Sequence, residues 1–228
     1  NMAPTVAMMD PQSGDILDVG SISLNDLPGA DNITDFAVAM SRQMMISIDP
    51  NARPGMIEDW PAWHKRMARL LQIASMIKDW SAWHKRMARL LQIASIIKLS
   101  VEDLQIIAPH QSAEQFAKQH LEKSAGLVII TDGGEGATGY TGVATHKAPT
   151  PKIVLSDTVG AGDTLMGTML AWILDQGLSD AEALRKLDED GLKQMLRFAT
   201  SAAAINCQSV GCNPPTRAEI EAFLADWN

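Results

Sequence analysis

The sequence predicts an α/β protein with a mostly parallel sheet and helices on its two faces. Three compact apolar runs, at residues 44–49, 95–99 and 127–131, each end at a polar or glycine-rich segment, which is typical of buried parallel strands. Segments with helical spacing separate these runs, and such alternation indicates βαβ units with right-handed crossovers. Because ligands of these sheets collect at the carboxyl ends of the strands, a functional site is expected there.

The elements are expected in a regular order along the chain. Ser179 with Glu182, and Thr216 with Glu219, have the spacing of capping boxes and predict the starts of two C-terminal helices. The Thr, Val and Gly content of residues 140–146 favours a β segment over a helix. The remaining expected elements are strands at 19–24, 44–49, 95–99 and 127–131, and helices at 32–43, 101–108, 112–125 and 161–175.

Composition restricts the classes of partner. Of the 228 residues, 46% are hydrophobic and 20% charged, which is typical of a globular chain. The net charge of -8 opposes binding to nucleic acid, and the longest apolar stretch, at 165–174, is too short to cross a membrane. Cys207 and Cys212 are too few for a disulfide framework and lack the spacing of a zinc site. We therefore expect a cytoplasmic protein with reduced thiols that binds neither nucleic acid nor membranes.

A 20-residue segment occurs twice in tandem. Residues 59–78 and 79–98 differ only at Pro61 against Ser81 and at Met76 against Ile96. Each copy places its apolar residues at helical spacing, which predicts an amphipathic helix with a solvated basic face. Because 20 residues at about 100° each leave a phase error of roughly 200°, one continuous helix would turn the two apolar stripes apart. A break near residue 79 is expected, so that the copies form a hairpin or only one docks, within a single domain over residues 1–228.

The segment DTVGAGD, at residues 157–163, carries the strongest chemical signal. Its glycines let the backbone bend closely, and the following helix directs its first amides and its positive dipole end at this point, which forms an anion cradle. Asp163 lies in the first turn, where a carboxylate would repel an anion that was merely bound. A general base that accepts a proton from a substrate hydroxyl suits it better. The alternative is that Asp163 only caps the helix and that the glycines only form a turn.

DTVGAGD followed by a helix resembles the signature of the ribokinase-like (PfkB) carbohydrate kinases. Four other segments are similar to motifs of this family: SIDPNARP, KLSVED, IITDGGEGA and SAAAINCQSVGCNPPTRAEIEAFL. Their order and spacing match from Val19 to Asn228 once one repeat copy is removed. The DPNARP and PPTRAEIEAFL segments look most like the fructokinase branch. The resemblance implies a three-layer α/β/α ribokinase-like fold and ATP-dependent phosphorylation of a sugar hydroxyl, with fructose as the expected sugar.

The resemblance also implies roles for matching positions. Asp163 would be the catalytic base, and Asp103 would act through water on Mg²⁺, with Ser100 replacing the family's usual Asn. Asp157 would help to hold a monovalent cation such as K⁺. The remaining carried-over roles are the anion hole, at Gly160, Ala161 and Gly162; the ATP contacts, at Thr131, Gly133, Gly136, Thr200, Asn206 and Gly211; and the substrate side, at Asn51 and Arg53.

The same resemblance shows what is not recognisable in this chain. The family's N-terminal strands, its small β lid and most of its sugar contacts have no counterpart before Val19, so transfer by this chain is expected to be slow or absent. An apolar sheet edge would be bared, which favours homodimers or aggregation. A nucleotide-binding fragment, or an engineered duplication, without catalysis is therefore the second hypothesis. A dinucleotide-dependent oxidoreductase is a third, because Gly134, Gly136 and Gly139 match GxGxxG, although a helix should then follow the glycines.

Overall fold

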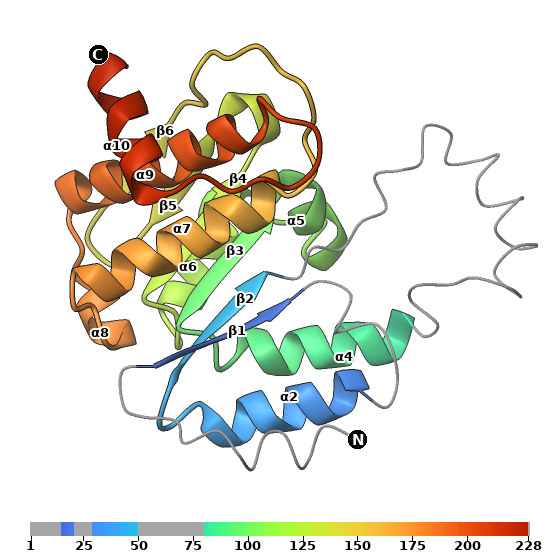
Figure 1. Cartoon of the computed structure of the whole chain (residues 1–228). Helices are drawn as coiled ribbons and strands as arrows, with labels where there is room; N and C mark the ends of the chain where they lie inside the picture. Colours follow the sequence, from blue (N-terminus) through green and yellow to red (C-terminus); the bar gives the residue numbers. More distant parts are fainter. Residues whose placement is uncertain (1–14, 21–28, 50–79, 228) are drawn as a thin grey trace, which may run out of the picture.

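Six strands of the described residues form one sheet whose spatial order follows the chain (Figure 1). The computed structural model describes residues 15–20, 29–49 and 80–227. The first four strands are parallel, whereas the last two continue the sheet as an antiparallel hairpin. This confirms the expected mostly parallel sheet. The strands are β1 (Ile16–Gly20), β2 (Met45–Asp49), β3 (Ile96–Ser100), β4 (Leu127–Thr131), β5 (Ala137–Tyr140) and β6 (Thr145–Ala148).

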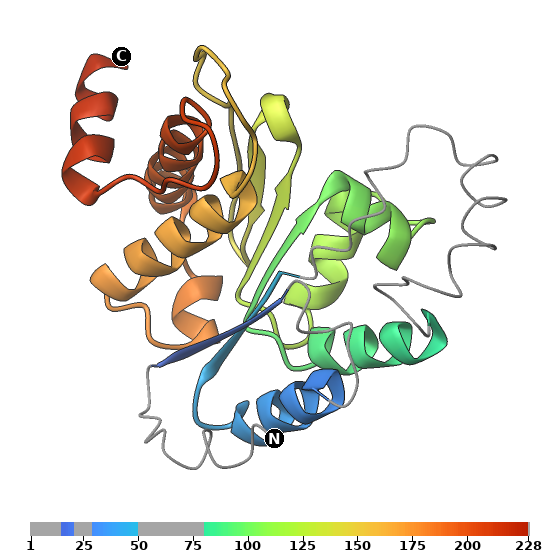
Figure 2. The same ribbon diagram turned by 45° about the vertical axis from the view of Figure 1, so that its right-hand side comes forward.

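Helices cover both faces of the sheet, which gives three layers (Figure 2). On one face the buried cluster combines strand residues with side chains of α2 (Gly29–Met40), α4 (Trp80–Leu91), α5 (Val101–Ile107) and α6 (Ala113–Leu121). On the other face a second buried cluster forms with the long helices of the C-terminal third. These and their neighbours are α7 (Ala161–Asp175), α8 (Ala181–Arg185), α9 (Glu189–Asn206) and α10 (Arg217–Asp226).

Several element bounds differ from those expected. Strand β1 begins at Ile16 instead of Val19, because Ile16 and Leu17 already pair with β2, and residues 21–24 of the expected strand lie outside the described residues. The expected β segment at 140–146 contains the end of β5, a turn at 141–144 and the start of β6, and in this turn the Thr141 amide donates to the Ala144 carbonyl. The predicted capping box at Ser179 was wrong: the Asp180 side chain caps α8, and α9 makes a third C-terminal helix. The box at Thr216 is confirmed at the start of α10.

The glycine-rich turn after β4 does not open a helix. A short 3-10 turn, η2 (Gly133–Glu135), leads directly into strand β5. A dinucleotide-binding βαβ unit requires a helix at this point, so that its amino end can receive the pyrophosphate. The geometry therefore disfavours the oxidoreductase hypothesis.

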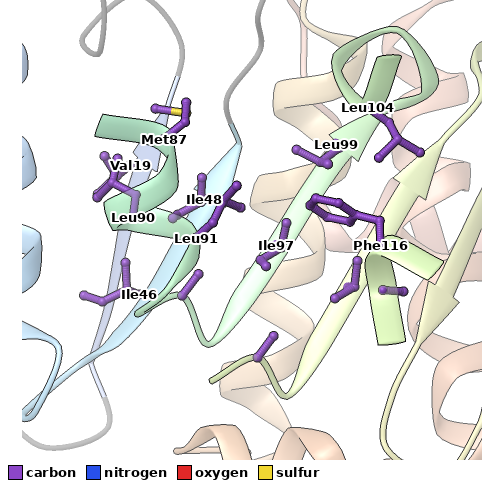
Figure 3. Close-up of a cluster of buried hydrophobic side chains, with 14 of the residues drawn as sticks. Val19, Ile46, Ile48, Met87, Leu90, Leu91, Ile97, Leu99, Leu104 and Phe116 are labelled. Carbon is purple, nitrogen blue, oxygen red and sulfur yellow. The ribbon is translucent and has the colours of Figure 1, made fainter. Parts of the chain in front are cut away.

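The second repeat copy supplies both α4 and most of β3. Figure 3 shows Met87, Leu90 and Leu91 packed over Ile46 and Ile48 of the neighbouring strand. The first copy, at 59–78, lies outside the described residues. The basic face of α4 is not simply solvated as expected, because Arg86 is only 5% exposed and pairs with Asp31 of α2. The more exposed Arg89 makes a second ion pair between α4 and α2, with Asp35 at 2.7 Å.

The residues after the second copy explain why this copy, and not the first, occupies the slot on the sheet that α4 and the start of β3 fill. In its register Leu99 completes β3 with no exposed surface, and Ser100 caps α5 through a capping box with Asp103. If the first copy took the same place, Asp79 would stand at the position of Leu99 and Trp80 at that of Ser100. A carboxylate buried without a partner costs several kcal/mol, and the lost cap about 1 kcal/mol more. The second copy is therefore the stable choice.

Deleting residues 59–78 should leave the fold intact, because the second copy and everything that follows it are retained. We expect thermal and urea unfolding to give a free energy of unfolding equal to that of the full chain, or about 1 kcal/mol higher because the connection between β2 and α4 is shorter. Deleting 79–98 instead is the matched control. This deletion leaves the first copy in place of the second, so Pro61 stands at position 81 and Met76 at the fully buried position 96. These two changes should lower the free energy of unfolding by about 1 kcal/mol. Loss of cooperative unfolding in both deletions would contradict this account.

Candidate active site

One face of the first three strands changes from apolar to polar toward the carboxyl ends. Ile16, Met45 and Ile96 pack into the cluster beneath α7 and α9. Because side chains alternate across a strand, the next residues on this face lie at positions 18, 47, 49 and 98. These residues are polar, namely Asp18, Ser47, Asp49 and Lys98. The site therefore has a polar floor on the α7 side of the sheet.

Lys98 and Asp49 form a buried ion pair in this floor. Lys98 Nζ lies 2.8 Å from Asp49 Oδ2, and the two side chains are 6% and 8% exposed. Burial raises the pKa of the Asp49 carboxyl above its usual range, while the Lys98 charge acts in the opposite direction. The negative charges of Asp103 and Asp163 also raise this pKa, so both carboxylates act on the same small region.

The first turn of α7 lies beside this pair. Lys98 Nζ is 3.2 Å from the point where a Cβ on Gly162 would stand, so glycine at this position lets the helix tip approach the ammonium. No described side chain caps the helix. The Ala161 amide donates to the Thr158 carbonyl at 3.2 Å, whereas the amides of Gly162 and Asp163 have no acceptor within the described ranges. Two free amides at a helix start, with its positive dipole end, form a cradle for an anion.

Asp163 is exposed at this helix tip. It borders a groove of about 370 Å³ between α7 and the segment that leads into α10. An open carboxylate within reach of two free amides can accept a proton from a bound hydroxyl while those amides bind an anion. The other groove residues include Thr164, Cys212, Pro215, Arg217 and Ile220.

Asp157 and Asn206 hold the loops around the helix tip. Asp157 accepts hydrogen bonds from the amides of Val159 (3.1 Å) and Gly211 (2.8 Å), and these bonds lower the pKa of its carboxyl. The fully buried Asn206 donates to the Val159 carbonyl at 2.8 Å and accepts from the Asn213 amide at 2.7 Å. Both side chains therefore stabilise the surrounding loops, independently of any contact with a bound ion or nucleotide.

The other predicted residues lie at the carboxyl ends of β3 and β4 or in α9. Asp103 is buried, and its Oδ2 accepts from both the amide and the hydroxyl of Ser100. Thr131 pairs with Ser100 in the sheet and leads into the turn that contains Gly133 and Gly136, both with positive φ. Thr200 is buried and donates to the Leu196 carbonyl of its own helix. Asn51 and Arg53 lie outside the described residues.

The sequence prediction did not include Lys98 and Asp49. Their signal was available, because polar residues interrupt two otherwise apolar strands at alternate positions, MISID and IIKLS. What the sequence alone does not show is that these two positions are neighbours. Ser47 pairs with Ile96 and Ile48 with Ile97, a register that sets Asp49 beside Lys98.

The free amides fit a phosphate group, whereas a metal would need further ligands. Among the residues that the structure describes, no group of three or more His, Cys, Asp or Glu side chains could hold a metal ion. Mg²⁺ at nucleotide sites is commonly held by one or two carboxylates together with the phosphates themselves. Asp103 and Asp163 are the carboxylates that could serve in this way.

Solved sugar kinases share this arrangement of sheet and helices, which is the ribokinase-like fold. The structure of fructokinase with bound ATP from Xylella fastidiosa matches with a TM-score of 0.73 at 23% identity, over 93% of this chain and 62% of that chain. Aminoimidazole riboside kinase from Salmonella enterica, complexed with aminoimidazole riboside and an ATP analog, matches with 0.69 at 20% identity, over 95% and 65%. The family model described as pfkB family carbohydrate kinase matches residues 57–219, and the chain belongs to this family.

Fructokinases are among the relatives in sequence. The fructokinase of Rhizobium leguminosarum bv. trifolii is 34% identical over 186 residues, which are 80% of this chain and 51% of the relative. Probable fructokinase-3 of Arabidopsis thaliana is 28% identical over 219 residues, or 94% and 56%. The chain thus spans about half the length of these relatives. No helix in the described parts of the chain has the length and apolar character that a membrane span requires.

Replacing Gly160 by alanine should destabilise the protein by about 2 kcal/mol. Gly160 has a φ of +77°, which costs an L-residue about 1 kcal/mol or more, and an added Cβ would collide with Cys212 Sγ. Gly167→Ala in the middle of α7 is the control, because its Cβ would meet nothing within 4 Å. This variant should gain about 0.5–1 kcal/mol from helix propensity. Chemical denaturation of both variants tests the pair, and equal effects would contradict the assigned backbone role.

Asp157→Asn should lower the melting temperature at neutral pH but not in acid. The pKa of Asp157 is depressed below its usual value of 3.8 in the folded state, so its stabilising effect is present above that value. The effect is lost as the pH falls through the depressed folded-state pKa, and the two melting curves should then converge. Asp132→Asn serves as the control, because the exposed Asp132 makes no side-chain cap. A constant difference across the pH range would contradict this role.

Proposed function

We propose that this chain carries the nucleotide-binding and catalytic part of an ATP-dependent sugar kinase. The observation that carries the proposal is the exposed Asp163 carboxylate beside two free amides at the tip of α7. Membership in the pfkB family supports the reaction class. The acidic body of the chain suits a soluble, cytoplasmic enzyme with small-molecule substrates.

The chain's own residues would act in one step. The tip of α7, with Gly160 as its cap and the amides of Gly162 and Asp163, binds the terminal phosphates of ATP. Asp163 accepts the proton of the attacking sugar hydroxyl as the bond from oxygen to phosphorus forms and the bond to ADP breaks. Asp103 would support a bound Mg²⁺ through water, and this ion would neutralise phosphate charge. A monovalent cation beside Asp157 would fix the loop at residues 157–160.

Fructose is the proposed sugar. Relatives in sequence are named fructokinases, and a fructokinase from Vibrio cholerae was solved in a fructose, ADP and calcium ion bound form. Asn51 and Arg53, which follow β2 in the sequence and lie outside the described residues, remain the proposed contacts to the sugar. Thr131, Gly133, Gly136, Thr200 and Gly211 remain the proposed surroundings of the nucleotide, with Asn206 acting through the loop that it holds.

A second candidate is a chain that binds nucleotide without transferring phosphate. The specific observation in its favour is length, since the chain spans about half of its relatives. Water that reaches the phosphoryl group competes with the sugar unless the site closes around both substrates. A homodimer that covers the β1 edge of the sheet, where the described part of the chain pairs no further strand, would be one means of supplying missing surface.

Replacing Asp163 by Asn should leave nucleotide binding intact and lower turnover by about 10²- to 10⁴-fold, because a general base is lost without loss of the cradle. Binding is measured by the shift in melting temperature with ATP and Mg²⁺, and turnover by fructose-dependent release of ADP. Asp190→Asn is the matched control, because Asp190 is an exposed acid in the first turn of a different helix, α9.

The outcomes separate the two candidates. Turnover in the unaltered chain that depends on Asp163 supports the kinase. Stabilisation by ATP with no transfer in the unaltered chain supports the binding fragment. Turnover unaffected by Asp163→Asn would remove this residue from the mechanism.

A further inference from the structure

A groove of about 370 Å³ lies on the face of the sheet opposite to α7. Its walls come from α4, from the end of α5 and from α6, and Figure 3 shows Leu91 and Phe116 on either side of Ile97 of β3. The groove shares no lining residue with the one that Asp163 borders. A hollow of this size can hold a small molecule.

His120 of α6 brings an unpartnered nitrogen to this groove. The imidazole lines the groove and is only 5% exposed, and its Nδ1 has no hydrogen-bond partner among the described residues. The ring makes a hydrogen bond to the backbone of Leu91, at the end of α4 where carbonyls lack helical partners. Burial, and then the charge of Lys123, lower the pKa of the imidazole below its ordinary 6.5. In the neutral ring Nε2 carries the proton that the Leu91 carbonyl accepts, so Nδ1 is an acceptor.

A second acceptor at the same groove is also unpaired. Gln111 follows α5, and its Nε2 donates to Gln119 Oε1 of α6 at 2.8 Å, which fixes the orientation of the amide. Its Oε1 has no partner in the described part of the chain and almost no surface open to water. Buried acceptors are seldom left unpaired, because each loses the hydrogen bond that water would donate. Both atoms therefore require a group that donates hydrogen bonds.

The other lining residues indicate the rest of the ligand. Met87, Ile107 and Phe116 offer apolar surface, and thioether and phenyl groups pack favourably against an aromatic ring. The exposed Lys123 adds a positive charge to the lining, which contains no Asp or Glu among the described residues. This charge attracts an anionic group and repels a cation.

We propose that this groove is a binding site for a small aromatic acid that carries a hydroxyl group. The ring of the ligand lies against Met87 and Phe116, its hydroxyl donates to His120 Nδ1, and its carboxylate faces Lys123. Gln111 Oε1 accepts from a second hydroxyl where the ring carries one. Side-chain rotamer changes of the kind that commonly accompany binding open both acceptors to the ligand. The site does not depend on the proposed kinase function, because it lies on the other face of the sheet.

The test compares two acids that differ by one hydroxyl group. 4-Hydroxyphenylacetate and phenylacetate are titrated calorimetrically into the full chain without nucleotide. The hydroxy acid should bind with a Kd below about 1 mM. Phenylacetate should bind roughly 5- to 100-fold more weakly, because it leaves the buried acceptor unpaired. Equal affinity for the two acids would overturn the proposal, and so would the absence of binding by both, which would leave the groove to water.

His120→Phe tests the assigned acceptor. The variant keeps a ring beside Phe116, whose centroid lies 4.4 Å from that of His120, but removes the nitrogen. It should bind the two acids with affinities that agree within about twofold, because the hydroxyl gains no partner. A preference for the hydroxy acid that survives this substitution would place the hydroxyl elsewhere and contradict the site.

Lys123→Gln tests the position of the carboxylate. This variant should bind both acids about two- to fivefold more weakly, which is the range of an exposed ion pair. Lys118→Gln is the matched control, because Lys118 is an exposed lysine of α6 that does not line the groove. Equal effects of the two lysine substitutions would contradict the assigned orientation.

A further measurement needs no substitution, in case His120→Phe does not fold. When the histidines carry ¹⁵N, nuclear magnetic resonance reports each ring nitrogen separately, and the resonance of an acceptor nitrogen moves when it gains a donor. The Nδ1 resonance of His120 should move with the hydroxy acid and stay unchanged with phenylacetate. His146 of β6 should respond to neither acid. An Nδ1 resonance that moves equally with both acids, or with neither, would overturn the proposal.

Discussion

The packing of α4 against the sheet is the interaction on which the rest of the structure depends. Trp83, Met87 and Leu90 of this helix are almost fully buried over β1, β2 and β3. The slot accepts one of two nearly identical segments, and the residues that follow decide which one. That choice places Leu99 in β3 and puts Ser100, whose position is on the α7 face of the sheet, at the start of α5, whereas a lysine stands at the position of Lys98 with either copy. The packing on one face of the sheet therefore determines the chemistry of the other.

Signals that lie close together in the sequence predicted most of the fold. The apolar runs identified the buried strands, and DTVGAGD placed the start of α7 and the open carboxylate within it. The predictions failed where neighbours competed or where partners lie far apart. Asp180 replaced Ser179 as a cap because either side chain can accept an amide, and an adjacent acid also benefits from the helix dipole. The pairing of Lys98 with Asp49 spans 49 positions and follows only from the register of two strands.

Residues that resemble nucleotide and cation contacts also build the loops that present the helix tip. Asn206 is completely buried and uses both of its polar atoms on backbone partners, and Asp157 uses both oxygens in the same way. The backbone bends through a positive φ at Gly160, and these hydrogen bonds hold the segments beside the bend. Substitutions at these positions would combine a loss of architecture with any loss of binding, whereas Asp163 is exposed and can be changed with less effect on the fold.

The place at which the extra segment enters explains how the chain tolerates it. About 30 residues connect β2 to α4, where about 10 would remain after removal of one copy. The entropy of closing a loop grows only with the logarithm of its length, so this threefold extension costs about 1 kcal/mol. A tandem copying event at a crossover therefore leaves the parallel pairing on either side undisturbed. The same insertion within a strand would have shifted the register and turned polar and apolar faces over.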